Sequence, residues 1–75
     1  MIQEIKDVEV NELPIRLGQF LKLANAVQDG FEAKLHIQAG AVEVNGEIET
    51  RRGCQLAQDD LVSFEGQDYK LVIKN

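Results

Sequence analysis

The chain has 75 residues, a formal net charge of −5 and a single cysteine. A chain of this length buries only about 60% of the surface that its unfolded form exposes, so we predict one domain over 1–75, with no deep catalytic cleft. The net charge disfavours non-specific attraction to nucleic acid or anionic lipid, and one cysteine excludes an intramolecular disulfide.

Residues 2–10 alternate loosely between apolar and charged side chains, which predicts an edge strand or a strand-like arm that ends before Pro14. This stretch lacks the continuous apolar run of a signal peptide, and no segment approaches the roughly 20 apolar residues of a membrane-spanning helix. We therefore expect a cytoplasmic protein that does not associate with a membrane.

Two short amphipathic helices are predicted next. A helix over about 16–27 would leave Gly18, Gln19, Lys22 and Asn25 facing water and would bury an apolar stripe at helical spacing, made of Leu17, Phe20, Leu21, Ala24 and Val27. After a break of about three residues, Asp29 and Glu32 have the spacing of an N-terminal cap for a helix over about 30–39, and Gly40 is the expected stop. In this second helix Ala33 and Ile37 share one face, while Lys34 and Gln38 share a neighbouring one. The short connection predicts that the helices pack on each other.

A β-hairpin is indicated over 41–50, because Asn45-Gly46 tolerates the positive φ angles of a tight turn. A strict two-residue loop would place Val44 opposite Glu47, with an apolar side chain beside a carboxylate. We therefore expect a bulged or three-residue loop that brings Ile48 to the valine side.

Residues 50–60 are predicted to form a polar loop in which Asp59-Asp60 is a solvated turn. Two strands, over 61–65 and 69–74, are expected around Gly66. Their core candidates are Val62, Phe64, Leu71 and Ile73.

The inventory of reactive side chains argues against an enzyme. There is one histidine and one cysteine, with no Ser-His or Cys-His spacing and no phosphate-cradling glycine loop. His36 is expected to be a surface or half-buried polar residue, and Cys54 a packing thiol whose pKa the neighbouring Arg51 and Arg52 could lower. The aspartate pair supplies too few oxygen ligands for a metal, so no metal and no cofactor are expected.

Positive charge is concentrated in a few places. Residues 13–28 contain no acid, whereas carboxylates crowd the segments 4–12, 43–49 and 59–68. Five cations come from the two helices and the segment after the hairpin, and charge alone favours a solvated surface over a phosphate-binding patch. These cations are Arg16, Lys22, Lys34, Arg51 and Arg52.

A family resemblance changes that balance. The residues that carry it are Arg16-Leu17, Leu21, Ala33, Ile37 and Gly40-x-Val42-x-Val44-Asn45-Gly46. This pattern resembles the RNA-binding domain first seen in ribosomal protein S4, whose two helices and following hairpin are called the alpha-L motif. The resemblance covers residues 15–65, with Asp60-x-Val62 similar to the closing strand. More narrowly, 17–27 and 32–53 resemble the small stand-alone bacterial members, the YbcJ-like proteins.

The resemblance implies an α+β domain in which two packed short helices precede a β-hairpin and further antiparallel strands. It also implies a monomer that binds structured RNA, with ribosomal RNA or a ribonucleoprotein among the candidate targets. By position, the RNA-facing residues are Arg16, Lys22, Lys34, Arg51 and Arg52.

The chain departs from the family pattern at two places. Gly18 stands where many members have an acidic residue, and Asp29-Gly30 stands where they have Ser-Arg. The missing arginine implies either a weaker general RNA binder or one tuned to a narrower target. The competing hypotheses are an acidic protein-interaction module and a small carrier-like protein, the latter disfavoured because carriers end in Gly-Gly and this sequence ends in Lys74-Asn75.

Overall fold

The computed structural model describes residues 4–74, so residues 2 and 3 of the predicted first strand lie outside the described residues. Over this range the helices are α1 (Leu17–Leu23) and α2 (Gly30–Gln38). The strands are β1 (Ile5–Val10), β2 (Ile15–Arg16), β3 (Val42–Val44), β4 (Glu47–Ile48), β5 (Gln55–Leu56), β6 (Leu61–Phe64) and β7 (Gln67–Ile73). The expected α+β class is confirmed.

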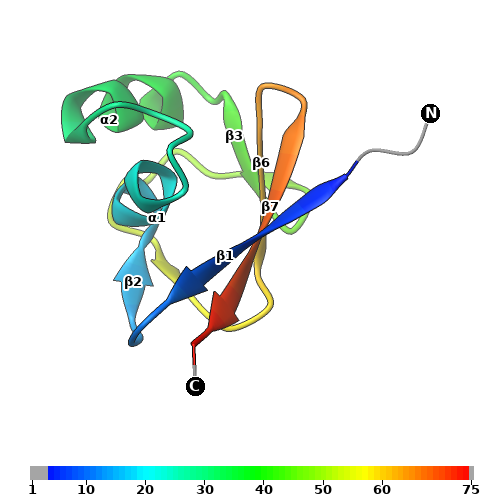
Figure 1. Ribbon diagram of the computed structural model, residues 1–75. Coiled ribbons are helices and arrows are strands. Elements are labelled where there is room, and N and C mark those ends of the chain that lie inside the picture. The colour runs from blue at the N-terminus through cyan, green and yellow to red at the C-terminus, as the bar shows by residue number, and fades with distance from the viewer. Residues whose placement is uncertain (1–3, 75) are drawn as a thin grey trace.

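The strands form one five-stranded sheet in the order β1-β7-β6-β3-β4 and a separate two-stranded sheet made of β2 and β5. Pairing in the large sheet is antiparallel except between β1 and β7, which run parallel. The prediction of β1 as an edge strand is confirmed. Both helices lie together on one side of the molecule, at the left in Figure 1, while β1, β6 and β7 form the other side.

One apolar core joins the helices to the sheet, and its fully buried side chains come largely from the predicted positions. Leu17, Phe20 and Leu21 of α1 are 0% exposed, as are Ala33 and Ile37 of α2. The sheet contributes Val42, Val62 and Leu71, and burial of each such side chain is worth about 1.5–3 kcal/mol. Tyr69 is also buried, whereas the core candidate Ile73 is only half-buried.

Helix α1 ends four residues earlier than predicted, and its C-terminal hydrogen bonds give the reason. Asn25 adopts a positive φ of 59°, its N–H donates to the Lys22 carbonyl (3.1 Å), and the Ala26 N–H donates to the Leu21 carbonyl (3.0 Å). This pattern is the Schellman motif, with asparagine in place of the usual glycine. The connection to α2 therefore spans residues 24–29 instead of three residues, although the two helices still pack together.

Helix α2 has the predicted ends. The Asp29 carboxylate accepts from the Glu32 N–H (2.8 Å), and the Glu32 carboxylate accepts from the Gln28 N–H (2.8 Å). At the other end Gly40 has a φ of 80°, which an L side chain rarely adopts, and its N–H donates to the Ile37 carbonyl (3.1 Å).

The hairpin has the strict two-residue loop, so the expected bulge is wrong. Asn45 and Gly46 have φ values of 53° and 85°, the positive angles that the mirror-image turn requires, and Val44 faces Glu47. Ile48 pairs with Glu43 and is 65% exposed. The valines of β3 need no cover from Ile48, because they lie against β6, which supplies Phe64 and Val62 as register partners.

The expected polar loop over 50–60 contains a short strand that the sequence did not reveal. Ile15 pairs with Leu56 and Arg16 pairs with Gln55, and the Leu56 side chain is only 3% exposed. Strand β5 therefore fixes the segment after the hairpin to the residues that lead into α1.

Candidate nucleic-acid interface

The loop after the hairpin docks on the first turn of α1. The Leu17 N–H donates to the Cys54 carbonyl (2.8 Å), and the Gly18 N–H donates to the Arg52 carbonyl (3.2 Å). Groups at a helix start have no partner within the helix, so the loop satisfies two of them. These bonds hold the backbone of Arg52 against α1.

Gly18 makes room for the Arg52 side chain. Although predicted to face water, Gly18 is buried, and a Cβ atom placed on it would lie 2.9 Å from the Arg52 Cγ. The aliphatic stem of Arg52 thus lies over the helix start, where any side chain at position 18 would displace it. The first departure from the family pattern therefore has a local structural explanation.

A shallow depression of about 410 Å³ brings three of the five predicted cations together. Arg16 enters from the residue before α1, Lys22 from its last turn and Arg52 from the docked loop. The remaining lining residues are small or uncharged, namely Gly18, Gln19, Gly30 and Gly53. Within residues 4–74 the three cations form no salt bridge, so their charges are available to an anionic ligand.

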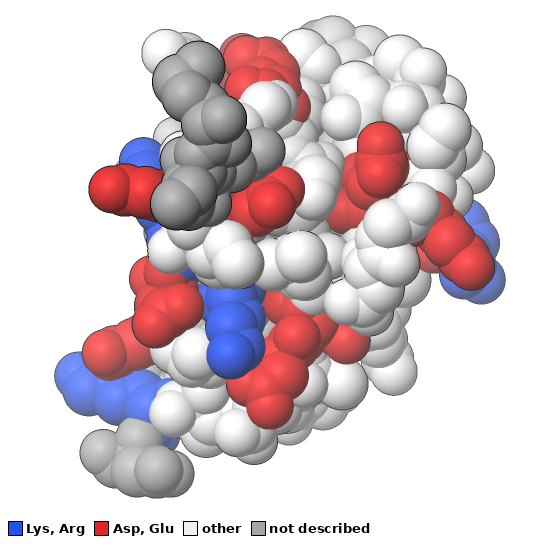
Figure 2. All heavy atoms as spheres, turned by 90° about the vertical axis from the view of Figure 1, so that its right-hand side faces the viewer, with Lys and Arg blue, Asp and Glu red and all other residues white. Residues whose placement is uncertain are grey.

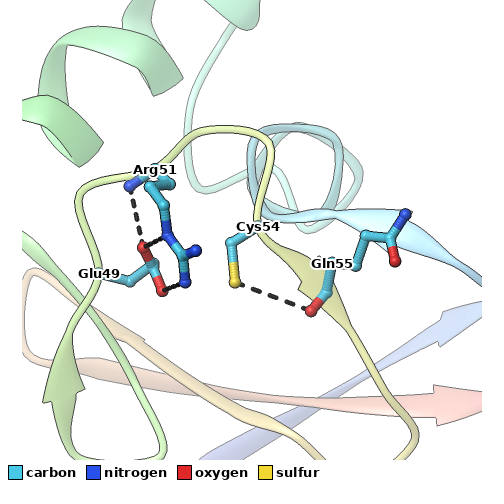
Figure 3. A network of polar contacts seen from close by, with 4 residues as sticks. All are labelled: Glu49, Arg51, Cys54 and Gln55. Carbon is cyan, nitrogen blue, oxygen red and sulfur yellow. Dashed lines mark hydrogen bonds and ion pairs between the residues drawn. The ribbon is translucent and has the colours of Figure 1, made fainter.

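Arg51 does not line this depression and is bound to Glu49, as Figure 3 shows. Its Nε donates to Glu49 Oε2 (2.9 Å), its Nη2 donates to Oε1 (3.1 Å), and its backbone N–H donates to Oε2 (3.0 Å). These bonds lower the pKa of Glu49 to about 2, and the same contact raises the pKa of Arg51. Glu49 was not among the predicted site residues, although residues two apart on an extended segment point the same way.

Lys34 also lies outside the depression. It is half-buried on α2, one helical turn after Gly30, which lines the rim. The role that the resemblance implies for Lys34 thus remains a prediction.

The thiol of Cys54 behaves opposite to the expectation. Its partial burial raises its pKa, and the neighbouring Glu49 carboxylate adds to that shift and outweighs the opposing effect of Arg51. The net effect therefore disfavours the reactive thiolate. His36 is half-buried as expected, with its ring 4.8 Å from that of Phe64 in an edge contact.

Acidic side chains are prominent on the side of the molecule turned away from the helices, where lysine and arginine are interspersed among them (Figure 2). Across residues 4–74, no group of three or more His, Cys, Asp or Glu side chains is placed to hold a metal ion. Neither helix has the length and apolar character needed to cross a bilayer.

Comparison with known proteins gives one family. The model of the S4 domain matches residues 8–72. The solution structure of YbcJ from E. coli, reported to contain an alpha-L motif involved in RNA binding, aligns with a TM-score of 0.71 at 30% identity, over 96% of this chain and 92% of that one.

Two curated relatives are similar in sequence. RlbA of Bacillus subtilis (strain 168), which is named as a probable ribosome maturation protein, is 42% identical over 59 residues, covering 79% of this chain and 83% of the relative. YbcJ of Escherichia coli (strain K12), which is named as a putative RNA-binding protein, is 36% identical over 58 residues, covering 77% of this chain and 83% of the relative.

Proposed function

This chain belongs to the S4 domain family, and from that premise we propose that it binds structured RNA, with ribosomal RNA as the first candidate, and catalyses no reaction. The observation that carries this proposal is the depression shared by Arg16, Lys22 and Arg52. Three unpaired cations around a glycine-lined surface suit the phosphate backbone of a folded RNA, whose grooves are recognised mainly by shape and phosphate contacts.

The local charge explains how an acidic protein can bind a polyanion. The depression lies at the helices, whereas many carboxylates lie on the side away from them (Figure 2). At physiological salt the Debye length is about 8 Å, so distant surface charges are largely screened at the bound phosphates. RNA is thus expected to approach the helical side only.

The ribosomal target is supported by the name of RlbA, the relative that is 42% identical to this chain. Gly30 lines the rim and places no side chain where the family usually has an arginine, so the rim fits either a weaker general RNA binder or one tuned to a narrower target. We propose that affinity arises mainly from the depression, with Arg51 and Lys34 contributing at its margins.

A salt titration with purified, refolded bacterial ribosomal RNA tests the proposal. Three neutralised phosphates predict a slope of log affinity against log salt of roughly −2 to −3, and five predict roughly −4. A slope near zero would contradict binding through phosphates. A pull-down with and without RNase provides the comparison with the protein-interaction hypothesis: RNase-resistant recovery of one protein would favour that hypothesis instead.

A further inference from the structure

Glu49 accepts hydrogen bonds from only some of the donors of the Arg51 guanidinium. An arginine carries five N–H donors, and Glu49 accepts from the one on Nε and from one on Nη2. Both donors of Nη1 and the second donor of Nη2 are left over, and one N–H of Nη1 and one of Nη2 together form the outer edge of the planar group. Figure 3 shows the third guanidinium nitrogen turned away from the carboxylate.

We propose that Glu49 is a positioning residue, which holds Arg51 so that the outer edge of its guanidinium receives two oxygens of an RNA phosphate. This inference rests on the proposed RNA-binding function and assigns a role to an acidic residue within it. The outer edge has the same parallel pair of N–H groups that makes arginine a bidentate ligand for phosphate.

The exposure of the two side chains indicates that Glu49 orients Arg51 and does not block its access to RNA. The Arg51 side chain is 77% exposed, whereas that of Glu49 is 16% exposed. The carboxylate therefore lies beneath the guanidinium, on the protein side, and leaves the outer edge open to solvent. A lysine could not serve both partners in this way, because its ammonium group lacks the fixed planar fork.

The hairpin places Glu49 at this point. The Glu49 N–H donates to the Val42 carbonyl (3.0 Å), which continues the ladder set by the two-residue turn. Its carboxylate also accepts from the backbone N–H of Arg51, so a backbone hydrogen bond holds the carboxylate in place beside the guanidinium. Glu49 is ionised at neutral pH, and its lowered pKa, about 2, keeps the contact charged in mildly acidic solution as well.

A double-mutant cycle tests this role through affinity for purified, refolded bacterial ribosomal RNA. Glu49→Gln removes the bidentate partner, and we expect about 2- to 10-fold weaker binding because the complex must then order a free arginine side chain. In the Arg51→Gln background the same change should leave affinity unchanged or raise it, since only a repelling charge is lost.

A matched control separates positioning from simple charge removal. Glu47→Gln makes the same charge change on an exposed residue of the same hairpin, and it should leave affinity unchanged or raise it slightly. Glu49→Asp, which keeps the charge, should retain more affinity than Glu49→Gln. The Arg51 Nε–H resonance in a ¹H–¹⁵N spectrum should shift in Glu49→Gln, and thermal unfolding should establish that each variant is folded.

The inference and the proposed function fail in different ways. If Glu49→Gln binds as tightly as the unmodified protein or more tightly, or if Arg51→Gln has no effect, the positioning role is wrong while RNA binding stands. If the unmodified protein shows no salt-dependent binding, the proposed function itself is wrong.

Discussion

Replacing Gly18 by alanine should displace the Arg52 side chain from the rim of the depression while leaving the fold intact. The new Cβ would lie 2.9 Å from Arg52 Cγ, closer than real Cβ contacts allow, so the arginine stem must rotate. Gly30→Ala is the matched control, because Gly30 also begins a helix and lines the same depression, yet a Cβ there meets nothing within 4 Å.

The two substitutions differ in their expected free energies. Within a helix, alanine raises the free energy of unfolding by about 0.5–1 kcal/mol relative to glycine. Gly30→Ala should show most of this stabilisation, which corresponds to a melting temperature higher by roughly 2–8 °C. In Gly18→Ala that gain is offset by about 0.5–1.5 kcal/mol for an arginine forced from its rotamer, so stability should change by less than about 1 kcal/mol.

Affinity should separate the variants more clearly than stability. Loss of a prearranged Arg52 should weaken RNA binding about 2- to 10-fold in Gly18→Ala, because the side chain must be ordered again on binding. Gly30→Ala should bind as the unmodified protein does. In an Arg52→Met background, which keeps the stem without the charge, Gly18→Ala should have little further effect.

Fluorescence-detected RNA titrations at fixed salt, together with thermal unfolding, check these values. If Gly18→Ala left affinity within error of the unmodified protein while Arg52→Met weakened it, Gly18 would not position Arg52. Equal losses in Gly18→Ala and Gly30→Ala would also contradict that role, since the cause would then be the depression in general and not Arg52.

Three further predictions concern other contacts. The Glu49 carboxyl should titrate near pH 2 in a ¹³C NMR experiment, and its pKa should rise in Arg51→Gln, although the backbone N–H at position 51 still donates to the carboxylate and keeps the pKa below its ordinary value of 4.5. Because the folded pKa is lowered, the contribution of Glu49 to stability is present above about pH 4.5 and is lost as the pH falls through 2. A normal Glu49 titration in the unmodified protein would contradict this. Asn45→Asp should lower the free energy of unfolding in urea by about 0.5–1.5 kcal/mol, because it replaces the amide that donates to Asp60 (3.1 Å) by a repelling carboxylate while it keeps an oxygen that can accept from the Leu61 N–H (2.9 Å). An unchanged free energy of unfolding would contradict this. Cys54 should be alkylated by iodoacetamide with a half-maximal rate above about pH 9, because its pKa is raised from 9.0; a midpoint below that would contradict the burial and the Glu49 contact.

The predictable parts of the fold are those where neighbours along the chain decide the structure. The cap formed by Asp29 and Glu32 and the stop at Gly40 need only a few consecutive residues, and both are confirmed. The early end of α1 was not foreseen, since asparagine at position 25 is a weaker signal than glycine for a positive φ. The bulge was predicted from the valines that a strict turn sets opposite carboxylates, Val44 with Glu47 and Val42 with Glu49, without knowledge of β6, which lies beside both valines.

The candidate site was predictable as a set of residue types but not as an arrangement. Grouping Arg16 with Arg52 depends on β5, a strand of two residues that is too short for any periodicity to reveal. Arg51 is paired with Glu49 whereas the cations of the depression are unpaired, and this difference depends on a hairpin register that the turn sets. Gly18 looked like a surface position because its burial arises from a loop more than 30 residues away in the sequence.

The parallel pairing of β1 with β7 closes the longest loop in the sheet. Ile5 finds its register partner only at Asp68, so β1 must wait for the far end of the sequence before it gains a neighbour in the sheet. The contact between α1 and α2 and the hairpin close much shorter loops, and short loops close at lower entropic cost. The basic depression, built within residues 16–53, therefore depends on contacts that close shorter loops than the pairing of β1 at the sheet edge does.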